Sequence, residues 1–157
     1  MFFLSWVITH FSLIAVQPGG SDFTYTILMT ETNATKVTPF LNVKNGEAAV
    51  QFYMSAFDAI EVKRFDMPDG KLSSVIEIDG ARFYVADEEA QNGNLAPDEN
   101  SINSVRIILQ TKNADRLFDQ AISAGALAIC PMTTEDDWRI GKLKDPFGHV
   151  WELGYTL

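Results

Sequence analysis

The chain has 157 residues, a formal net charge of −9 at pH 7 and one cysteine. This length suits one domain or two small modules sharing a core. The acidic balance argues against nucleic acid as a partner, because phosphate backbones repel such a surface. A single cysteine excludes an intramolecular disulfide and favours a reducing, cytoplasmic compartment. The sequence contains no paired-cysteine metal site, no phosphate-binding glycine loop and no nucleophile motif.

The first 35 residues differ in character from the rest and are expected to lie outside the fold. Residues 1–16 are nearly all apolar, and no lysine or arginine precedes Lys36. The segment is short for a membrane span and lacks the basic start of a secretory signal. It fits an export signal or anchor, an amphipathic or disordered arm, or a stretch that is absent when translation starts at Met29. We expect the start at Met29, and hence a cytoplasmic protein without membrane contact; retention of residues 1–16 would favour export or anchoring.

Two segments of the chain repeat at a constant spacing of 68 residues. Three pairs of identical residues share this separation: Asn45 and Asn113, Ser55 and Ser123, and Gly80 and Gly148. Matches at one spacing across two segments indicate duplicated modules rather than chance. We predict modules at residues 36–88 and 104–157, joined by a polar linker at residues 89–103.

The first module is predicted to contain a strand, a helix and several further strands. Residues 37–43 have an extended pattern, and Asn45 is a suitable N-cap for the helix that follows. Apolar residues recur at helical spacing in this helix: Ala49, Phe52, Tyr53, Ala56 and Phe57. A turn sequence at residues 79–80 predicts a hairpin of residues 72–78 and 82–86.

The second module is predicted to repeat this order. Residues 105–111 form its first strand, Asn113 caps its helix and Gly125 ends it. The apolar residues of this helix are Leu117, Phe118, Ala121 and Ile122. An apolar extended run then reaches Cys130, which we expect to be a small buried side chain. A turn at residues 145–148 precedes the last strand.

Three stretches carry a family resemblance: the strand and helix at residues 37–53, the helix exit at residues 56–59 and the hairpin at residues 144–153. They resemble the vicinal-oxygen-chelate superfamily, which includes glyoxalases and bleomycin-resistance proteins. The run Asp-Pro-Phe-Gly-His-x-Trp at residues 145–151 is similar to the PhnB-like branch. The resemblance implies an α+β fold of tandem βαβββ modules, whose curled mixed sheet forms a cleft. It also implies a homodimer.

Metal-using members of this superfamily take two ligands from the first strands of the modules and two from the last strands. The resemblance maps these positions onto Thr38, Tyr84, Arg106 and Glu152; the 68-residue spacing relates Thr38 to Arg106 and Tyr84 to Glu152. Histidine or glutamate is usual there, and only Glu152 fits. Arg106 would repel a divalent ion. We therefore expect no cofactor, with a divalent metal as the alternative.

The same residues suggest what a metal-free cleft would do. Arg106 and Glu152 either pair with each other or present a cation and an anion to a polar ligand. Tyr84 would add a phenol donor and an aromatic face, beside Thr38. Trp138, in a strongly polar loop, either stacks on a ligand or makes a packing or dimer contact.

Three functions remain open from the sequence. The first, which we favour, is a small-molecule binding protein similar to bleomycin-resistance proteins. The second is a metal-dependent lyase, isomerase or dioxygenase of the glyoxalase kind. The third is a metal-free isomerase or lyase, with Glu152 as the base and Arg106 stabilising an enolate-like anion. Whether the protein is an enzyme stays open.

Overall fold

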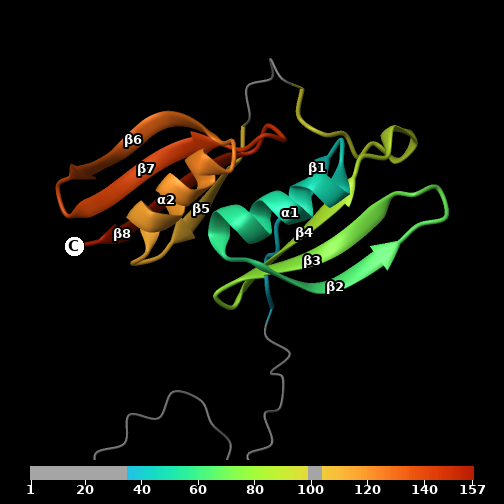
Figure 1. Cartoon of the computed structure of the whole chain (residues 1–157), viewed down its shortest axis with the longest axis horizontal. Coiled ribbons are helices and arrows are strands. Elements are labelled where there is room, and N and C mark those ends of the chain that lie inside the picture. Colours follow the sequence, from blue (N-terminus) through green and yellow to red (C-terminus); the bar gives the residue numbers. More distant parts are fainter. Residues whose placement is uncertain (1–34, 99–103) are drawn as a thin grey trace, which may run out of the picture. The chain divides into compact units, whose positions relative to one another are not determined.

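The computed structural model of the protein describes residues 35–98 and 104–157. The chain divides after Thr35, and the described helices and strands all belong to the unit Lys36–Leu157. The first module contains β1 (Phe40–Val43), α1 (Gly46–Phe57), β2 (Ile60–Asp66), β3 (Leu72–Ile78), β4 (Ala81–Asp87) and the short 3₁₀ helix η1 (Ala90–Asn92). The second module contains β5 (Arg106–Gln110), α2 (Ala114–Ser123), β6 (Leu127–Glu135), β7 (Trp138–Lys144) and β8 (Val150–Thr156) (Figure 1).

Each module forms its own four-stranded mixed sheet. The first sheet has the order β1-β4-β3-β2 and the second has the order β5-β8-β7-β6. The β1–β4 and β5–β8 pairs are parallel, and the other neighbours are antiparallel. Phe40 pairs with Tyr84 in the first sheet, and Ile108 pairs with Glu152 in the second. Both pairs are related by the 68-residue spacing, so the predicted α+β fold with tandem βαβββ modules is confirmed.

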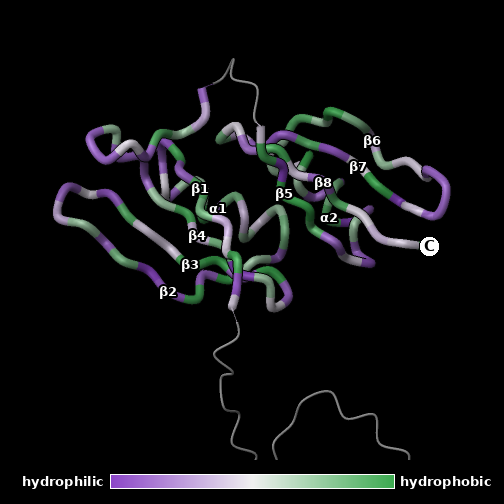
Figure 2. The backbone as a smooth tube through the Cα atoms, turned by 180° about the vertical axis from the view of Figure 1, so that it is seen from behind, coloured by the Kyte–Doolittle hydropathy of each residue, from purple (hydrophilic) through white to green (hydrophobic). Residues whose placement is uncertain are grey.

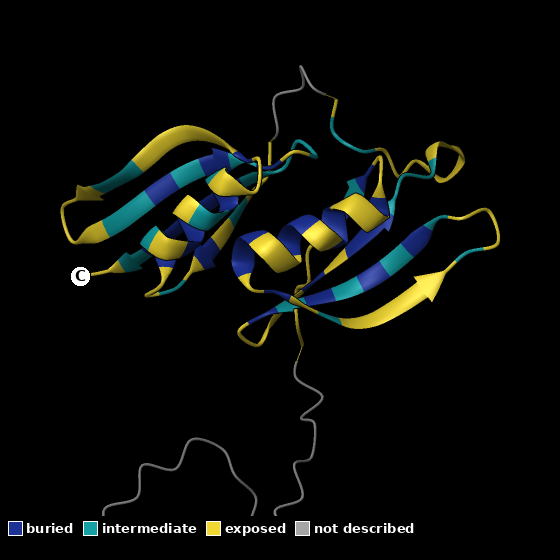
Figure 3. Cartoon of the chain, viewed as in Figure 1, coloured by how far each residue is buried: buried dark blue, intermediate teal, exposed yellow. Residues whose placement is uncertain are grey.

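The helix of each module covers one face of its sheet (Figure 1). Side chains that point toward the helix are buried, as Ile76 and Ile78 of β3 are, whereas Val75 and Glu77, which alternate with them, are half-buried. This alternation follows from the two-residue period of a strand. Figure 3 shows the same stripes on β3 and on the two faces of α1. The face that carries no helix of its module is called the open face below.

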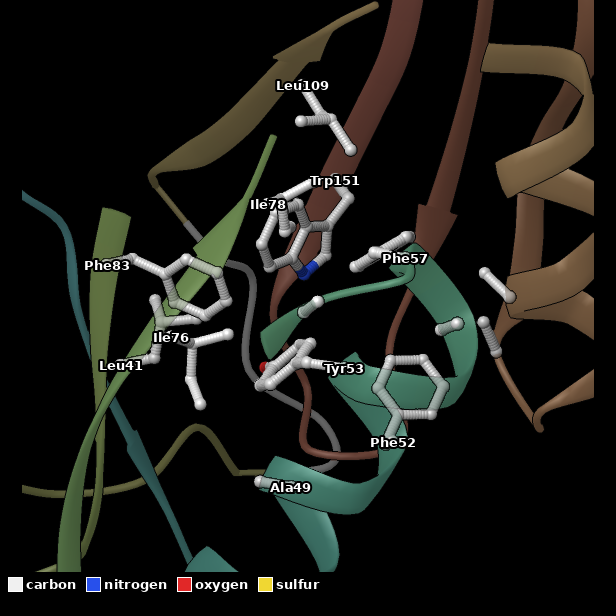
Figure 4. Packing of buried hydrophobic residues seen from close by; sticks show 14 of the residues in the cluster. Leu41, Ala49, Phe52, Tyr53, Phe57, Ile76, Ile78, Phe83, Leu109 and Trp151 are labelled. Atoms are coloured by element: carbon white, nitrogen blue, oxygen red, sulfur yellow. The ribbon is translucent and has the colours of Figure 1, made fainter. Parts of the chain in front are cut away.

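Aromatic residues from both modules form one core. Trp151 of β8 has ring centroids 4.9 Å from Phe57, 5.5 Å from Phe83 and 5.6 Å from Tyr53 (Figure 4). All four side chains are at most 5% exposed. The apolar residues predicted for the first helix are likewise buried. Because Trp151 comes from the last strand and the other three rings from the first module, the modules share a core.

A buried carboxylate, Asp145, accepts four hydrogen bonds, and the one from Tyr53 links the two modules. Its Oδ2 accepts from the Tyr53 hydroxyl at 2.7 Å and from Trp151 Nε1 at 3.0 Å. Its Oδ1 accepts from the backbone amides of Phe147 and His149, each at 2.9 Å. Burial, together with the charge of Asp145, raises the pKa of Tyr53 well above its ordinary value. Asp145 thus satisfies its lone pairs within the protein, as a buried carboxylate must.

The two helix starts differ, although both begin after an asparagine. Asn45 caps α1 as predicted, because its backbone is extended and its Oδ1 accepts from the Ala48 amide at 3.0 Å. The same prediction for Asn113 is wrong, since its side chain makes no capping bond. The Asn113 backbone (φ −90°, ψ 16°) is not extended, and its amide donates to Thr111 Oγ1 at 3.2 Å. A turn at Thr111 therefore replaces the asparagine cap.

None of the described helices is long and apolar enough to span a membrane. The expectations for residues 1–16 and for a start at Met29 fall outside the described residues, as do residues 99–103 of the predicted linker. The described part of that linker holds η1 and an isolated bridge between Glu89 and Asn94.

Candidate functional site

The open face of the second sheet holds a nearly buried carboxylate between two cations. Glu152 lies between Trp151 and Leu153, which face the core, so its side chain points to the open face. Its Oε1 is 2.8 Å from Arg106 Nη1 and 2.9 Å from Lys142 Nζ. The Glu152 side chain is 10% exposed, compared with 27% for Lys142 and 53% for Arg106. Three neighbouring strands, β5, β8 and β7, thus bring one anion and two cations together.

This arrangement has a physical reason. An ionised carboxylate that leaves water without a partner is strongly disfavoured, whereas two nearby cations offset that cost. Lys142 is the direct cross-strand partner of Glu152 on β7, and Arg106 comes from β5, where Ile108 is the partner of Glu152. Of the two arrangements predicted for Arg106 and Glu152, the structure has them paired. Lys142 was not predicted; its alternation with the fully buried Leu143 was the available signal.

Tyr84 lies on the open face of the first sheet. Its neighbours Phe83 and Val85 are buried in the core, whereas Tyr84 is 37% exposed. The Tyr84 ring stacks on Phe40 of β1, with centroids 5.5 Å apart and planes 11° from parallel. No hydrogen bond, ion pair or ring contact joins Tyr84 to Glu152 among residues 35–98 and 104–157. The first sheet therefore presents an aromatic surface, and the second a charged one.

Trp138 lies farther from Glu152 than the sequence suggested, and Thr38 lies outside the strands. Thr38 is exposed and precedes β1, which begins after Pro39 because proline has no amide to donate to the ladder. The prediction that Trp138 lies in a loop is wrong, since it is the first residue of β7. Trp138 shares the open face with Lys142, but four residues of strand separate them, which is about 13 Å. The structure thus brings only Arg106 and Glu152 together from the predicted set.

The donor chemistry at the four mapped positions does not fit a divalent metal ion. Thr38 and Tyr84 are weak ligands, and Arg106 brings a positive charge against Glu152. In the part of the chain that the structure describes, no group of three or more histidine, cysteine, aspartate or glutamate side chains is placed to hold a metal. A single carboxylate already paired with two cations is a poor start for a metal site.

Two pockets lie elsewhere in the described unit. One of about 380 Å³ lies where the modules meet, between the C-terminal end of α1 near Asp58 and the β5–α2 connection near Asn113. The other lies beside the turn that contains Pro146. Glu152 lines neither pocket; its side chain lies on the open face of its sheet.

Cys130 is not the buried side chain that its apolar surroundings predicted. It is exposed on β6, where its cross-strand partner is Lys142. β6 is an edge strand that pairs with β7 alone, and most of its residues are exposed, as Figure 3 shows. The apolar run therefore belongs to the edge strand of the second sheet, and Cys130 does not pack into the core.

Comparison with known proteins gives the family. The model of the Glyoxalase/Bleomycin resistance protein/Dioxygenase superfamily matches residues 33–153. The uncharacterized protein Mb0911c of Mycobacterium bovis is 35% identical over 128 residues, which cover 77% of this chain and 83% of that protein. The structure of the Arabidopsis thaliana At5g48480 gene product is 29% identical with a TM-score of 0.59, and covers 76% of this chain and 98% of that one. The PhnB protein from Bacillus cereus is 19% identical with a TM-score of 0.60, and covers 78% of this chain and 100% of that one. The chain therefore belongs to the glyoxalase/bleomycin resistance protein/dioxygenase superfamily.

Proposed function

We propose that the protein binds a small organic molecule on the open faces of its sheets, without a bound metal ion. The observation that carries the proposal is Glu152, a carboxylate held at 10% exposure on a sheet face by Arg106 and Lys142. Polar groups that converge beside apolar side chains are typical of ligand sites. The protein acts in the cytoplasm, and the run at residues 145–151 favours the PhnB-like branch of the superfamily.

A second copy of the chain completes this site. The open faces carry large apolar side chains that are more than one third exposed: Phe40, Phe65, Tyr84 and Ile108. Exposed apolar patches of this kind mark interfaces or ligand grooves. Figure 2 shows hydrophobic stretches along the sheet strands, seen from behind the view of Figure 1. Association of two copies would cover these side chains and give the ligand a second wall.

The dimer is tested by sedimentation equilibrium of the wild-type chain and of Ile108→Asp. Ile108 is 61% exposed, so a charge there leaves the fold intact but disfavours an apolar contact. Leu95→Asp is the matched control, because Leu95 is 62% exposed in the segment between the modules. A monomeric wild-type chain, or a dimer that Ile108→Asp leaves unchanged, would contradict this arrangement.

Metal-free binding is tested by elemental analysis and a ligand screen. We expect full-length protein purified without chelator to contain far less than one equivalent of Zn, Fe, Mn or Ni. Its melting temperature should rise with a small organic ligand and not with these ions. One equivalent of metal that is lost in Glu152→Gln would instead support a metal-dependent enzyme.

A metal-free isomerase or lyase is the second candidate, with Glu152 as the base and Arg106 as the cation that stabilises an enolate-like anion. It is favoured by the free oxygen of Glu152: within the described ranges, no hydrogen bond ends on Oε2. Loss of the ligand's α-proton signal in D₂O, absent with Glu152→Gln, would support this reaction. A ligand that binds without proton exchange or turnover would exclude this reaction and support binding only.

A further inference from the structure

Arg106 and Lys142 share one oxygen of one carboxylate. The closest contact of each cation is with Glu152 Oε1, at 2.8 Å and 2.9 Å. In the described part of the chain, neither cation makes an ion pair with any other carboxylate. One negative charge therefore faces two positive charges at this point of the open face.

A third cation, Lys144, lies on the same face as Arg106 and Lys142, and the three are called the positive patch. Lys144 follows the fully buried Leu143 and so points to the same open face as Lys142, two residues away on β7. The whole chain has 12 lysines and arginines and a net charge of −9. Arg106, Lys142 and Lys144 thus lie on the same open face as Glu152. Arg106 and Lys142 neutralise Glu152 and leave a net positive charge on this face of an otherwise acidic protein.

We propose that Arg106 and Lys142 form an anion-binding pair, and that the ligand of the open face is a small organic acid such as a hydroxycarboxylate. This inference rests on the proposed function, because it names the ligand class of the same site. The two side chains supply, next to a carboxylate, the positive charge that a divalent ion supplies in metal-using sites. The guanidinium offers a planar pair of donors to a carboxylate, and the ammonium adds a mobile point charge. Adding a monoanion brings the sum for Arg106, Lys142, Glu152 and the ligand to zero.

Glu152 has two parts in this site. Without ligand it is the counter-ion that holds both cations over the sheet. With ligand bound, its Oε2 is available to accept a hydrogen bond from a hydroxyl next to the acid group. A neutral amide of the same shape offers the hydroxyl but not the charge, so acid and amide pairs separate the two contributions.

The test is an NMR titration of full-length protein with two acid–amide pairs, mandelate with mandelamide and lactate with lactamide. We expect an acid to bind about tenfold more tightly than its amide, and to weaken as salt rises. Lys142→Met and Arg106→Met should each remove most of this preference, and Lys142→Arg should restore it. Lys112→Met is the matched control, because Lys112 is an exposed lysine in the β5–α2 connection.

Glu152→Gln separates this inference from a metal site. If Arg106 and Lys142 bind the acid, removal of their counter-ion should strengthen acid binding by about fivefold. If Glu152 instead holds a metal ion, the same variant should lose that metal. Equal binding of acid and amide that Lys142→Met leaves unchanged would refute the anion pair and leave small-molecule binding in place. No binding of either acid would also refute it, whatever the wider ligand screen finds. The Lys142 variants carry the test if Glu152→Gln does not fold.

Discussion

Replacing Tyr53 with phenylalanine removes one hydrogen-bond donor from the buried carboxylate that links the modules. The Tyr53 hydroxyl donates to Asp145 Oδ2 at 2.7 Å, and both side chains are at most 2% exposed. A hydrogen bond to a charged group contributes about 1.5–3 kcal/mol. Three donors remain on Asp145 in the variant, so the carboxylate stays partly satisfied. We therefore expect the free energy of unfolding to fall by about 2 kcal/mol.

Urea unfolding of the full chain, followed by tryptophan fluorescence, measures this loss. Tyr84→Phe makes the same chemical change at a hydroxyl on the open face and should stay within about 0.5 kcal/mol of wild type. Asp145→Ala leaves two buried and two partly buried donors without their acceptor and should cost more than Tyr53→Phe. A Tyr53→Phe variant as stable as Tyr84→Phe would refute the view that Asp145 joins the modules.

The same tyrosine sets an alkaline limit on stability. The pKa of Tyr53 is raised in the folded state, so its contribution is fully present below the unfolded value of about 10. It is lost as the pH rises above that value. Stability of the wild type should therefore fall more steeply above about pH 10 than stability of Tyr53→Phe. Parallel pH profiles of the two proteins would contradict this coupling.

Three further predictions follow from single residues. Gly154→Ala should destabilise the fold by about 1–3 kcal/mol in urea unfolding, because a Cβ there would lie 2.6 Å from the Arg139 carbonyl oxygen. Asn45→Ala should cost about 1 kcal/mol and Asn113→Ala less than about 0.5 kcal/mol, since only Asn45 caps its helix; equal losses would contradict the different helix starts. The hydrogen bond from Arg139 lowers the pKa of Asp115 in the folded state. The Asp115 carboxylate therefore stabilises the fold above its unfolded pKa of about 3.9 and loses this effect as the pH falls. In an acid titration followed by circular dichroism, the loss of stability should be shallower for Asp115→Asn than for wild type.

The repeat made the fold predictable. The predictions that failed concern local structure at single residues, among them Asn113 and Trp138. The 68-residue spacing relates Phe40 to Ile108 and Tyr84 to Glu152, and the two sheets pair these residues in the same register. The Asn113 cap failed because the Asn113 backbone is not extended, so its side chain does not accept from the first helical amides. A polar composition suggested a long loop before Trp138, yet strands accept polar residues on an exposed face, and the turn needs only two residues between β6 and β7.

The candidate site was predictable in position but not in chemistry, because equivalent positions have diverged between the modules. Tyr84 and Glu152 occupy the same place in their sheets, and so do Phe40 and Ile108. At these positions the first module has a stacked aromatic pair. The second module has a carboxylate whose ion-pair partners come from the strands on both sides of it. One of those partners, Lys142, can be assigned only when the β7–β8 register is known. An aromatic wall and a charged wall are what a ligand with an apolar body and an acid group needs. In the proposed dimer, the aromatic face of one copy would lie against the charged face of the other, and the partner copy would be part of the proposed site.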